Sequence, residues 1–206
     1  MLKIAVLVSG GGTNLQAILD AKAAGQIPHG EIALVIASRP DAYALTRAKN
    51  AGVAAAVVRR SEYADGEAFD EALLSTLRGA QIDLIVLAGY LTILSPRIIA
   101  AYPRRILNVH PSLIPSFCGE GFYGLRVHEA ALAKGVRVTG ATVHFVNEIP
   151  DGGEILLQKA VAVEPDDTPE RLQRRVMEQA EWQLLPRAIE LCCRELSAKE
   201  QNPAKA

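Results

Sequence analysis

The sequence predicts an α/β protein with a doubly wound, mostly parallel sheet, and three observations lead to this fold class. Short apolar runs rich in Val, Ile, Leu and Ala alternate with segments in which apolar residues recur every three to four positions. Such alternation is typical of parallel sheets with helices on both faces. Near the end, two strand-like segments follow each other across a short polar turn, and a long amphipathic segment succeeds them. We therefore expect an antiparallel C-terminal strand pair and a long C-terminal helix.

The first two thirds of the chain hold the parallel part of this pattern. We expect strands at 2–10, 31–38, 54–58, 83–90 and 105–111, and helices at 14–25, 41–52, 66–80 and 95–103. Ser95 and Pro96 are typical of a helix start, because serine caps the first turn and proline is tolerated at its first position.

The last third changes character. Strands are expected at 140–148 and 153–165, and a helix begins with Thr168 as its N-cap and is kinked or ended by Pro186. Internal repeats, low-complexity segments and linkers are absent from the sequence. We therefore expect one domain over residues 1–195 and a polar, disordered tail over residues 196–206.

Composition excludes several classes of protein. The 206 residues are half hydrophobic, and 22 basic against 23 acidic residues leave a formal net charge of -1, which favours neither nucleic acid nor an anionic membrane. No apolar run reaches about 18 residues, so no transmembrane helix is expected. The three cysteines form neither a disulfide framework nor a CxxC pair, which predicts a reducing cytoplasm. Because the four histidines also lack the close spacing of metal ligands, we expect no metal. The chain enters its first strand without a leader pattern, which also favours the cytoplasm.

A glycine-rich loop, VSGGGTNL at residues 8–15, joins the first expected strand to the first helix. Ligands usually bind at the carboxyl ends of parallel strands, and a helix N-terminus offers free N–H groups to an anion. Leu15 stands in place of the third glycine of GxGxxG, and no Walker A lysine follows. The loop therefore favours a single phosphate monoester, with side-chain hydrogen bonds from Thr13 and Asn14. The alternative is a flexible turn with Asn14 as helix cap.

Asn108 and His110 stand at alternate positions of the last parallel strand, just before Pro111. Alternation places both on one side of the strand, overhanging the same crevice as the glycine loop. An amide donor beside an imidazole can stabilise a developing oxyanion. The alternative is that Asn108 caps a turn and His110 is a satisfied, half-buried histidine.

Asp151 lies in an Asp-Gly-Gly turn between the two C-terminal strands. An aspartate before two glycines is commonly turn chemistry. A carboxylate close to His110 would instead favour the imidazolium and raise its pKa, but the sequence by itself does not bring the two together. His144 lies on a strand face that can look into the same cleft, and His128 is expected on a helix.

Several segments together resemble one known family. They are SGGGTNL, VLAGYLTILSP, ILNVHPSLIP, GATVHFVNEIPDGG and EWQLLP. In this order, from about residue 1 to about residue 190, they are similar to the phosphoribosylglycinamide formyltransferases, the folate-dependent transformylases of purine biosynthesis. The motif around Asn108 and His110 is shared more widely among formyl-folate enzymes. Its combination with the glycine loop and the Asp-Gly-Gly turn is specific, and it implies the Rossmann-like formyltransferase fold.

The resemblance implies both substrates and the residues that contact them. A formyl group would pass from 10-formyltetrahydrofolate, the co-substrate, to the amine of N1-(5-phosphoribosyl)glycinamide in de novo IMP synthesis. The matching positions are Asn108, His110 and Asp151 for catalysis; Gly11, Gly12, Thr13, Asn14 and Glu181 for the ribonucleotide; and Leu91, Thr92, Ile93, Leu94, Asn108, His144 and Asn147 for the folate. The alternative for Glu181 is a solvated helix glutamate.

The resemblance also implies a mechanism. The amine would attack the formyl carbon directly, and Asn108 with protonated His110 would stabilise the tetrahedral intermediate. Asp151 would keep His110 charged and help the proton transfer. Cys118 is an alternative nucleophile, but the motif places no activating base beside it.

Two departures from the family pattern concern the folate. Thr92 and Gly66 stand where some relatives carry an arginine, so contacts with the folate tail are expected to differ. The segment SFCGEGFYGLRVHE, residues 116–129, is longer than in some members, and its glycines suggest a mobile flap over the substrate.

Three rival functions share parts of this pattern. A methionyl-tRNA formyltransferase is expected to carry a second, basic domain, and a formyltetrahydrofolate deformylase an N-terminal regulatory domain; neither fits a chain of this length and charge. A phosphate-binding module without catalysis is the third. We expect small-molecule substrates, no nucleic-acid or membrane partner, and a monomer or homodimer.

Overall fold

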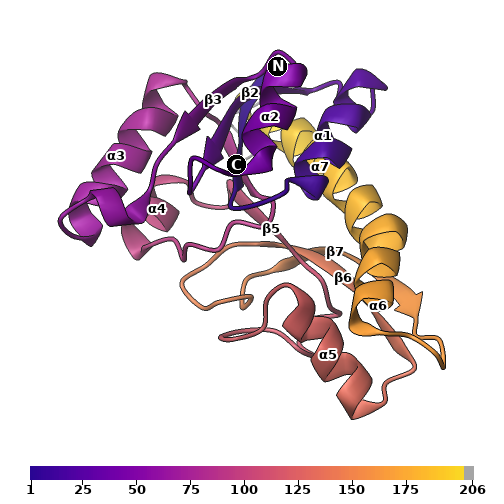
Figure 1. Cartoon of the computed structure of the whole chain (residues 1–206). Coiled ribbons are helices and arrows are strands. Elements are labelled where there is room, and N and C mark those ends of the chain that lie inside the picture. The colour runs from indigo at the N-terminus through magenta and orange to yellow at the C-terminus, as the bar shows by residue number, and fades with distance from the viewer. Residues whose placement is uncertain (202–206) are drawn as a thin grey trace.

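A seven-stranded sheet runs through the described part of the chain, residues 1–201 of a computed structural model (Figure 1). The strands are β1 (Leu2–Val8), β2 (Gly30–Ala37), β3 (Ala54–Val57), β4 (Leu84–Leu87), β5 (Ile106–His110), β6 (Val138–Phe145) and β7 (Ile155–Ala162). They lie in the order β3-β2-β1-β4-β5-β6-β7, parallel up to β5 and antiparallel from β5 to β7. The predicted fold class and the antiparallel C-terminal strand pair are confirmed.

Helices cover both faces of this sheet. They are α1 (Thr13–Ala23), α2 (Tyr43–Asn50), α3 (Gly66–Gly79), α4 (Pro96–Ala101), α5 (Leu125–Lys134), α6 (Pro169–Val176) and α7 (Trp182–Gln201), with a short 3-10 turn η1 (Arg60–Glu62) and a π-helical segment η2 (Met177–Glu181). Helices α3 and α4 pack on one face, and the other α-helices pack on the opposite face (Figure 1).

The alternation of the strands produces this two-sided packing. In β1, Ile4 and Val6 join the core under α1 and α7, whereas Ala5 and Leu7 join the core under α3 and α4. All four side chains are fully buried, as expected for a central parallel strand covered on both faces. Strand β5 follows the same rule, so Leu107 and Val109 enter the first core and Asn108 and His110 point to the other side.

The predicted helix starts are present. The Ser95 hydroxyl accepts a hydrogen bond from the Ile98 N–H at the start of α4, and the Thr168 hydroxyl accepts one from the Arg171 N–H at the start of α6. In contrast, α5 is not among the expected helices, although His128 is placed on it as expected.

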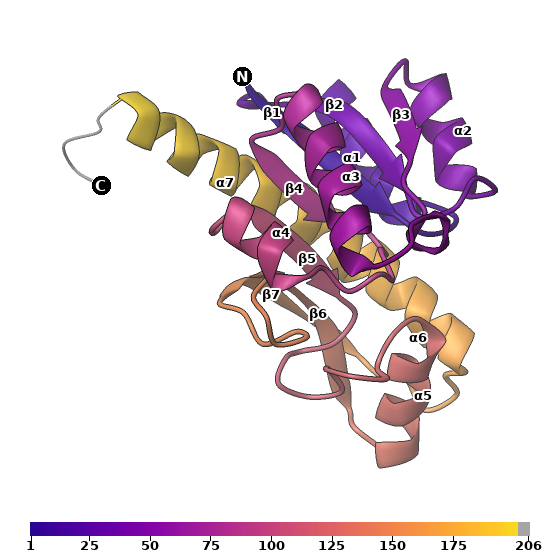
Figure 2. The same cartoon turned by 90° about the vertical axis from the view of Figure 1, so that its left-hand side faces the viewer.

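The C-terminal helix differs from its expectation in two respects. Of the two alternatives for Pro186, the one in which it ends the helix is wrong, because Pro186 lies inside α7, and α6, η2 and α7 form one long helical rod (Figure 2). The π-helical segment, Met177–Glu181, lies about one turn before Pro186. The expected tail also begins inside α7, because Leu196 packs against the core and the helix runs to Gln201. Its remainder, residues 202–206, lies outside the described residues.

The direction of chain winding reverses between β1 and β4. From β1 the chain moves outwards to β2 and β3, then returns to β4 on the other side. A reversal of this kind opens a crevice beyond the carboxyl ends of the strands, where α/β proteins bind ligands. The glycine loop after β1, the loop after β4 and the end of β5 all meet there.

Candidate active site

Asn108, His110, His144 and Asp151 converge at the end of β5. The Asp151 carboxylate lies 3.3 Å from His110 Nδ1, 3.5 Å from His144 Nε2 and 3.4 Å from Asn108 Nδ2. Asn108 Nδ2 also lies 3.1 Å from His144 Nε2, because the two residues pair directly across β5 and β6. The carboxylate that the sequence could not place is therefore in contact with both residues of the β5 motif.

The Asp-Gly-Gly turn brings Asp151 to this position. Asp151 has a φ of 54°, a left-handed conformation that aspartate tolerates better than most residues. A Cβ at Gly153 would lie 1.7 Å from the Phe145 carbonyl oxygen, so only glycine lets the turn fold back onto the end of β6. The Gly119 N–H then donates to the Asp151 carboxylate at 2.9 Å. The motif is therefore more than turn chemistry.

Hydrogen bonds to main-chain carbonyls fix both imidazoles. His110 Nε2 lies 2.8 Å from the Phe117 carbonyl, which only accepts, so this nitrogen carries a hydrogen. His144 Nδ1 lies 2.9 Å from the Phe145 carbonyl and donates in the same way, while His144 Nε2 faces both Asn108 Nδ2 at 3.1 Å and Asp151 Oδ1 at 3.5 Å. The alternative in which His110 is a merely satisfied histidine does not explain why its second nitrogen faces Asp151.

Burial and charge act in opposite directions on His110. The pKa of His110 lies below its ordinary value, because burial outweighs the opposing effects of Asp151 and the Phe117 carbonyl, and the nearby His144 lowers it as well. For Asp151, burial alone would raise the pKa, but the contact with His144, the Gly119 N–H and the charge of His110 together lower it. Asp151 is therefore a carboxylate at neutral pH, with two imidazoles around it.

Two adjoining cavities open onto these residues. One of about 480 Å³ is lined by Asn108, His110 and Asp151, together with the flap residues 119–124. The second, of about 130 Å³, is lined by Leu91, Thr92, Ile93, Leu94, Asn108, His144, Asn147 and neighbouring residues. All the positions expected to contact the folate therefore lie around one cavity, next to the trio expected to be catalytic.

Apolar side chains form the rim of the smaller cavity. Leu91 is 64% exposed, Ile93 76% and Ile149 66%, which is high for side chains of this size. Buried Tyr90 lines both cavities, and burial raises its pKa to about 12, so it is a neutral phenol. The smaller cavity therefore combines an apolar rim with polar side chains such as Asn108, His144 and Asp151.

The glycine loop meets the C-terminal rod on the other side of the crevice. Gly12, with a φ of 70°, is the N-cap of α1, so the alternative in which Asn14 caps this helix is wrong. Asn14 instead donates through Nδ2 to Glu181 at 2.7 Å, across 167 residues of sequence. Glu181 is buried at the end of the π-helical segment, and burial raises its pKa to about 7. It is not the solvated helix glutamate of the alternative.

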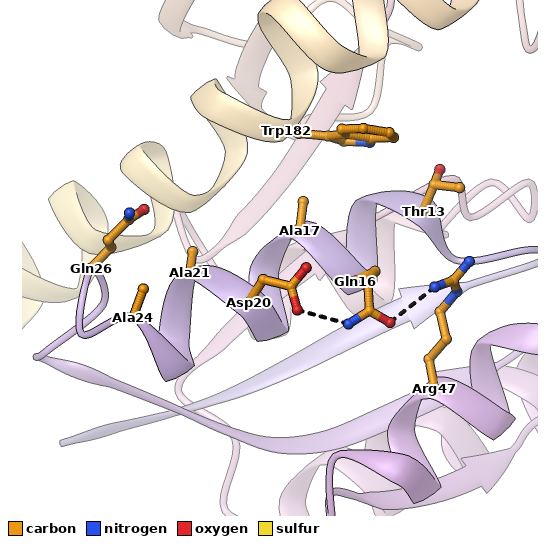
Figure 3. A pocket seen from close by; sticks show the side chains of 9 residues that line it. All are labelled: Thr13, Gln16, Ala17, Asp20, Ala21, Ala24, Gln26, Arg47 and Trp182. Carbon is orange, nitrogen blue, oxygen red and sulfur yellow. Dashed lines mark hydrogen bonds between the residues drawn. The ribbon is translucent and has the colours of Figure 1, made fainter.

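A third cavity lies beside this loop. Its volume is about 450 Å³, and Figure 3 shows Thr13, Gln16 and Arg47 at one end, with Trp182 facing α1. Dashed lines in the figure connect Asp20 to Gln16 and Gln16 to Arg47. Arg47 is a residue that the sequence did not single out.

The segment expected to be a flap divides into two parts. Residues 125–129 form the first half of α5, where Val127 and His128 are fully buried, so they belong to the body of the fold. Residues 116–124 have no regular secondary structure and lie along the larger cavity. Phe117 was missed because it acts through its carbonyl, which carries no sequence signal.

Cys118 lies in this segment, but its surroundings do not activate it. Its thiol donates to the Pro115 carbonyl at 3.3 Å, and burial together with Asp151 raises its pKa. A reactive cysteine needs a lowered pKa. Among residues 1–201, no cluster of three or more His, Cys, Asp or Glu side chains is placed to hold a metal, and no helix there is long and apolar enough to cross a membrane.

Comparison with known proteins agrees with this arrangement. Residues 2–189 match the formyl transferase family. The chain is 45% identical over 189 residues to phosphoribosylglycinamide formyltransferase of Haemophilus influenzae, covering 92% of this chain and 86% of that protein. It is 40% identical to the chloroplastic enzyme of Arabidopsis thaliana, covering 94% of this chain and 66% of that one. Glycinamide ribonucleotide transformylase 1 of Symbiobacterium toebii has the same fold, with a TM-score of 0.88 and 46% identity over 95% of this chain and 89% of that one.

Sequence, fold and site geometry thus lead to one conclusion. The matched region contains the glycine loop, the paired Asn108 and His110 on β5 and the turn that carries Asp151. The chain belongs to the formyl transferase family, as one of its phosphoribosylglycinamide formyltransferases, enzymes of purine biosynthesis.

Proposed function

We propose that this enzyme transfers the formyl group of 10-formyltetrahydrofolate to the amine of N1-(5-phosphoribosyl)glycinamide by direct attack. The observation that carries this proposal is the contact of Asp151 with both His110 and Asn108 between two cavities. The smaller cavity suits the pteridine, and the crevice leading to the glycine loop suits the ribonucleotide.

The ribonucleotide binds between the glycine loop and the C-terminal rod. Gly11, Gly12 and Thr13 hold the phosphate at the N-terminus of α1, where unpaired N–H groups and the helix dipole favour an anion. Asn14 and Glu181 form the next layer, and Glu181 accepts hydrogen bonds from the ribose hydroxyls. The glycinamide amine then extends towards β5.

The folate binds with its pteridine in the smaller cavity. Leu91, Ile93 and Leu94 contact the ring faces, while Thr92, His144 and Asn147 border its polar edge. N10 and its formyl group point into the larger cavity, between Asn108 and His110. Thr92 and Gly66 offer no guanidinium to the glutamate tail, so tail contacts differ from those of relatives with arginine there.

The uncharged amine attacks the formyl carbon, and the carbonyl oxygen becomes an oxyanion. Asn108 Nδ2 and His110 Nδ1 lie 3.4 and 3.3 Å from the Asp151 carboxylate, which is long for a hydrogen bond. Both groups can therefore donate hydrogen bonds to the oxyanion instead. Protonated His110 donates a hydrogen bond from Nε2 to the Phe117 carbonyl and one from Nδ1 to the oxyanion. Asp151, through water, moves the proton from the attacking nitrogen to N10, and the bond between carbon and N10 then breaks.

A turnover assay with glycinamide ribonucleotide and a 10-formyl folate tests this function. Loss of formyl-folate that requires the ribonucleotide, and that disappears in His110→Ala, is the expected result. Loss without the ribonucleotide would identify a deformylase instead. Binding of both compounds without turnover would leave a phosphate-binding module.

Asn108→Ala tests the oxyanion donor separately. Removal of one such donor costs roughly 100- to 1,000-fold in kcat. We expect this loss in kcat with little change in either KM, because the ground-state carbonyl interacts weakly. Asn50→Ala, at the exposed end of α2, serves as the matched control and should keep full activity. Near-normal turnover of Asn108→Ala would remove Asn108 from the mechanism.

A further inference from the structure

The glycine loop is held from behind by α2. The Gly10 carbonyl accepts a hydrogen bond from the Ala44 N–H at 3.2 Å, and the Gly11 carbonyl accepts one from Arg47 Nε at 2.8 Å. In a trans peptide the C=O and the following N–H point in opposite directions. The N–H groups of Gly11 and Gly12 therefore point away from α2.

The contact between the loop and α2 has no room for larger residues. A Cβ at Gly12 would lie 2.7 Å from the Ala44 Cβ, and the φ of 70° at Gly12 is unfavourable for any other residue. The loop therefore depends on α2 for its shape, and its N–H groups form a concave site of the kind that binds anions.

Arg47 is itself fixed from three sides. Besides Gly11, its guanidinium donates through Nη1 to Gln16 Oε1 at 2.9 Å, and it lies 5.1 Å from the centroid of the Tyr43 ring. Gln16 Nε2 in turn donates to Asp20 Oδ1 at 2.8 Å, so the chain of hydrogen bonds continues along α1 (Figure 3). A half-buried guanidinium, with hydrogen bonds from Nε and Nη1, thus connects α2, the loop and the first two turns of α1.

We propose that Arg47 is the positioning residue for the phosphate of the ribonucleotide, acting through the Gly11–Gly12 peptide. It orients this peptide so that its N–H faces the phosphate. Its charge, one peptide unit behind the loop, adds attraction for a dianion within the distance of about 8 Å over which charges act at physiological salt. The inference rests on the proposed function and assigns to it a residue that does not touch the substrate.

The test compares Arg47→Ala and Arg47→Lys with the wild-type enzyme. We expect Arg47→Ala to raise the KM for glycinamide ribonucleotide at least tenfold, with kcat and the KM for 10-formyl folate within twofold of wild type. Arg47→Lys should recover part of this loss, because the charge returns but the fixed contact with Gly11 does not. Lys49→Ala, which removes an exposed charge from the same helix, should leave all three constants unchanged.

The dephosphorylated substrate, glycinamide riboside, separates positioning from general damage. Arg47→Ala should use the riboside with the same kcat/KM as wild type, because no phosphate remains to be positioned. An equal loss with both substrates would assign Arg47 a merely structural role and overturn the proposal, as would an unchanged KM for the ribonucleotide. Failure of the wild-type enzyme to use the ribonucleotide would instead overturn the proposed function.

Discussion

At the scale of single residues, Asp151 is the group that favours the charged form of His110. Its negative charge opposes the burial that lowers the pKa of His110. Asp151→Asn removes this charge, so the pKa of His110 falls further and its imidazolium is lost at a lower pH. We expect kcat at pH 7 to fall by about 100- to 10,000-fold, the range of general acid–base catalysis. The alkaline limb of the kcat profile should also move to lower pH.

Rate profiles of kcat against pH from 5 to 9 check this prediction. Asp41→Asn, at an exposed position paired with Arg39, is the control and should keep the wild-type profile. An alkaline limb that stays in place in Asp151→Asn would show that Asp151 does not control the charge of His110.

Glu181 links substrate binding to stability. Burial raises its pKa from 4.5 to about 7, so the folded protein binds a proton there between these values and the unfolded chain does not. Stability from this group is therefore present at low pH and is lost as pH rises from 4.5 to 7. Because one pKa unit corresponds to about 1.4 kcal/mol, ionised Glu181 costs on the order of 3 kcal/mol.

Glu181→Gln removes this cost and keeps an acceptor for Asn14. We expect a higher Tm than wild type at pH 8, little difference at pH 4, and a raised KM for the ribonucleotide. Thermal unfolding at the two pH values and steady-state kinetics measure these effects. A variant less stable than wild type at pH 8 would contradict the assignment of Glu181 as a buried charge.

At the scale of elements, the turn between β6 and β7 is shaped around Asp151. Gly153→Ala would place a Cβ against the Phe145 carbonyl and push the turn outwards. Because a misplacement of about 1 Å can cost on the order of 100-fold, we expect a loss of this size in kcat. Gly79→Ala is the control, since its Cβ meets open space at the end of α3 and should be neutral or stabilising by up to about 1 kcal/mol. Equal kinetics in both variants would show that the turn tolerates movement.

The segment 116–124 contacts the catalytic side chains, whereas helix α5, which follows it, is held in the body of the fold. The segment supplies the Phe117 carbonyl to His110 and the Gly119 N–H to Asp151, so its position and the state of the catalytic groups depend on each other. Helix α5 is anchored by buried Val127 and His128. We infer that any closure over the substrate involves the segment alone, hinged at the start of α5.

At the scale of the whole molecule, the three cysteines differ in burial: two lie in the core, and one lies in the segment 116–124. Cys192 and Cys193 are buried on α7, and burial raises their pKa values to about 11 and 12. Cys118 is half-buried beside the active site. We expect a thiol reagent to modify one cysteine in the folded enzyme and three after unfolding, because only Cys118 is accessible.

Ligands should slow the modification of Cys118. Reaction rates at pH 8 with and without ribonucleotide and a folate analogue measure this, and Cys118→Ser is the control that should abolish the native-state reaction. A rate at Cys118 that ligands do not change would argue against closure of the segment over the substrate.

Periodicity and motif together determined much of this protein. Strand and helix alternation predicted the sheet, because burial on both faces forces long apolar runs, and Ser95 and Thr168 marked helix starts through capping that is local in sequence. Alternation also placed Asn108 and His110 on one side of β5. The resemblance, rather than any pattern, pointed to Glu181 and to the folate-contacting residues.

Tertiary structure decided what depends on contacts between distant segments. Asp151 reaches His110 only because the turn after β6 folds back, and Asn14 reaches Glu181 only because the C-terminal rod crosses the glycine loop. The contact of the Phe117 carbonyl with His110 could not be predicted, because every residue has a main-chain carbonyl. From the sequence, Arg47 is an ordinary charged residue on a helix, and its contact with Gly11 depends on how α2 packs against the glycine loop. The physical reason is that helices and strands form largely from local sequence preferences. The pKa of a side chain and the orientation of a peptide group depend instead on the residues packed against them.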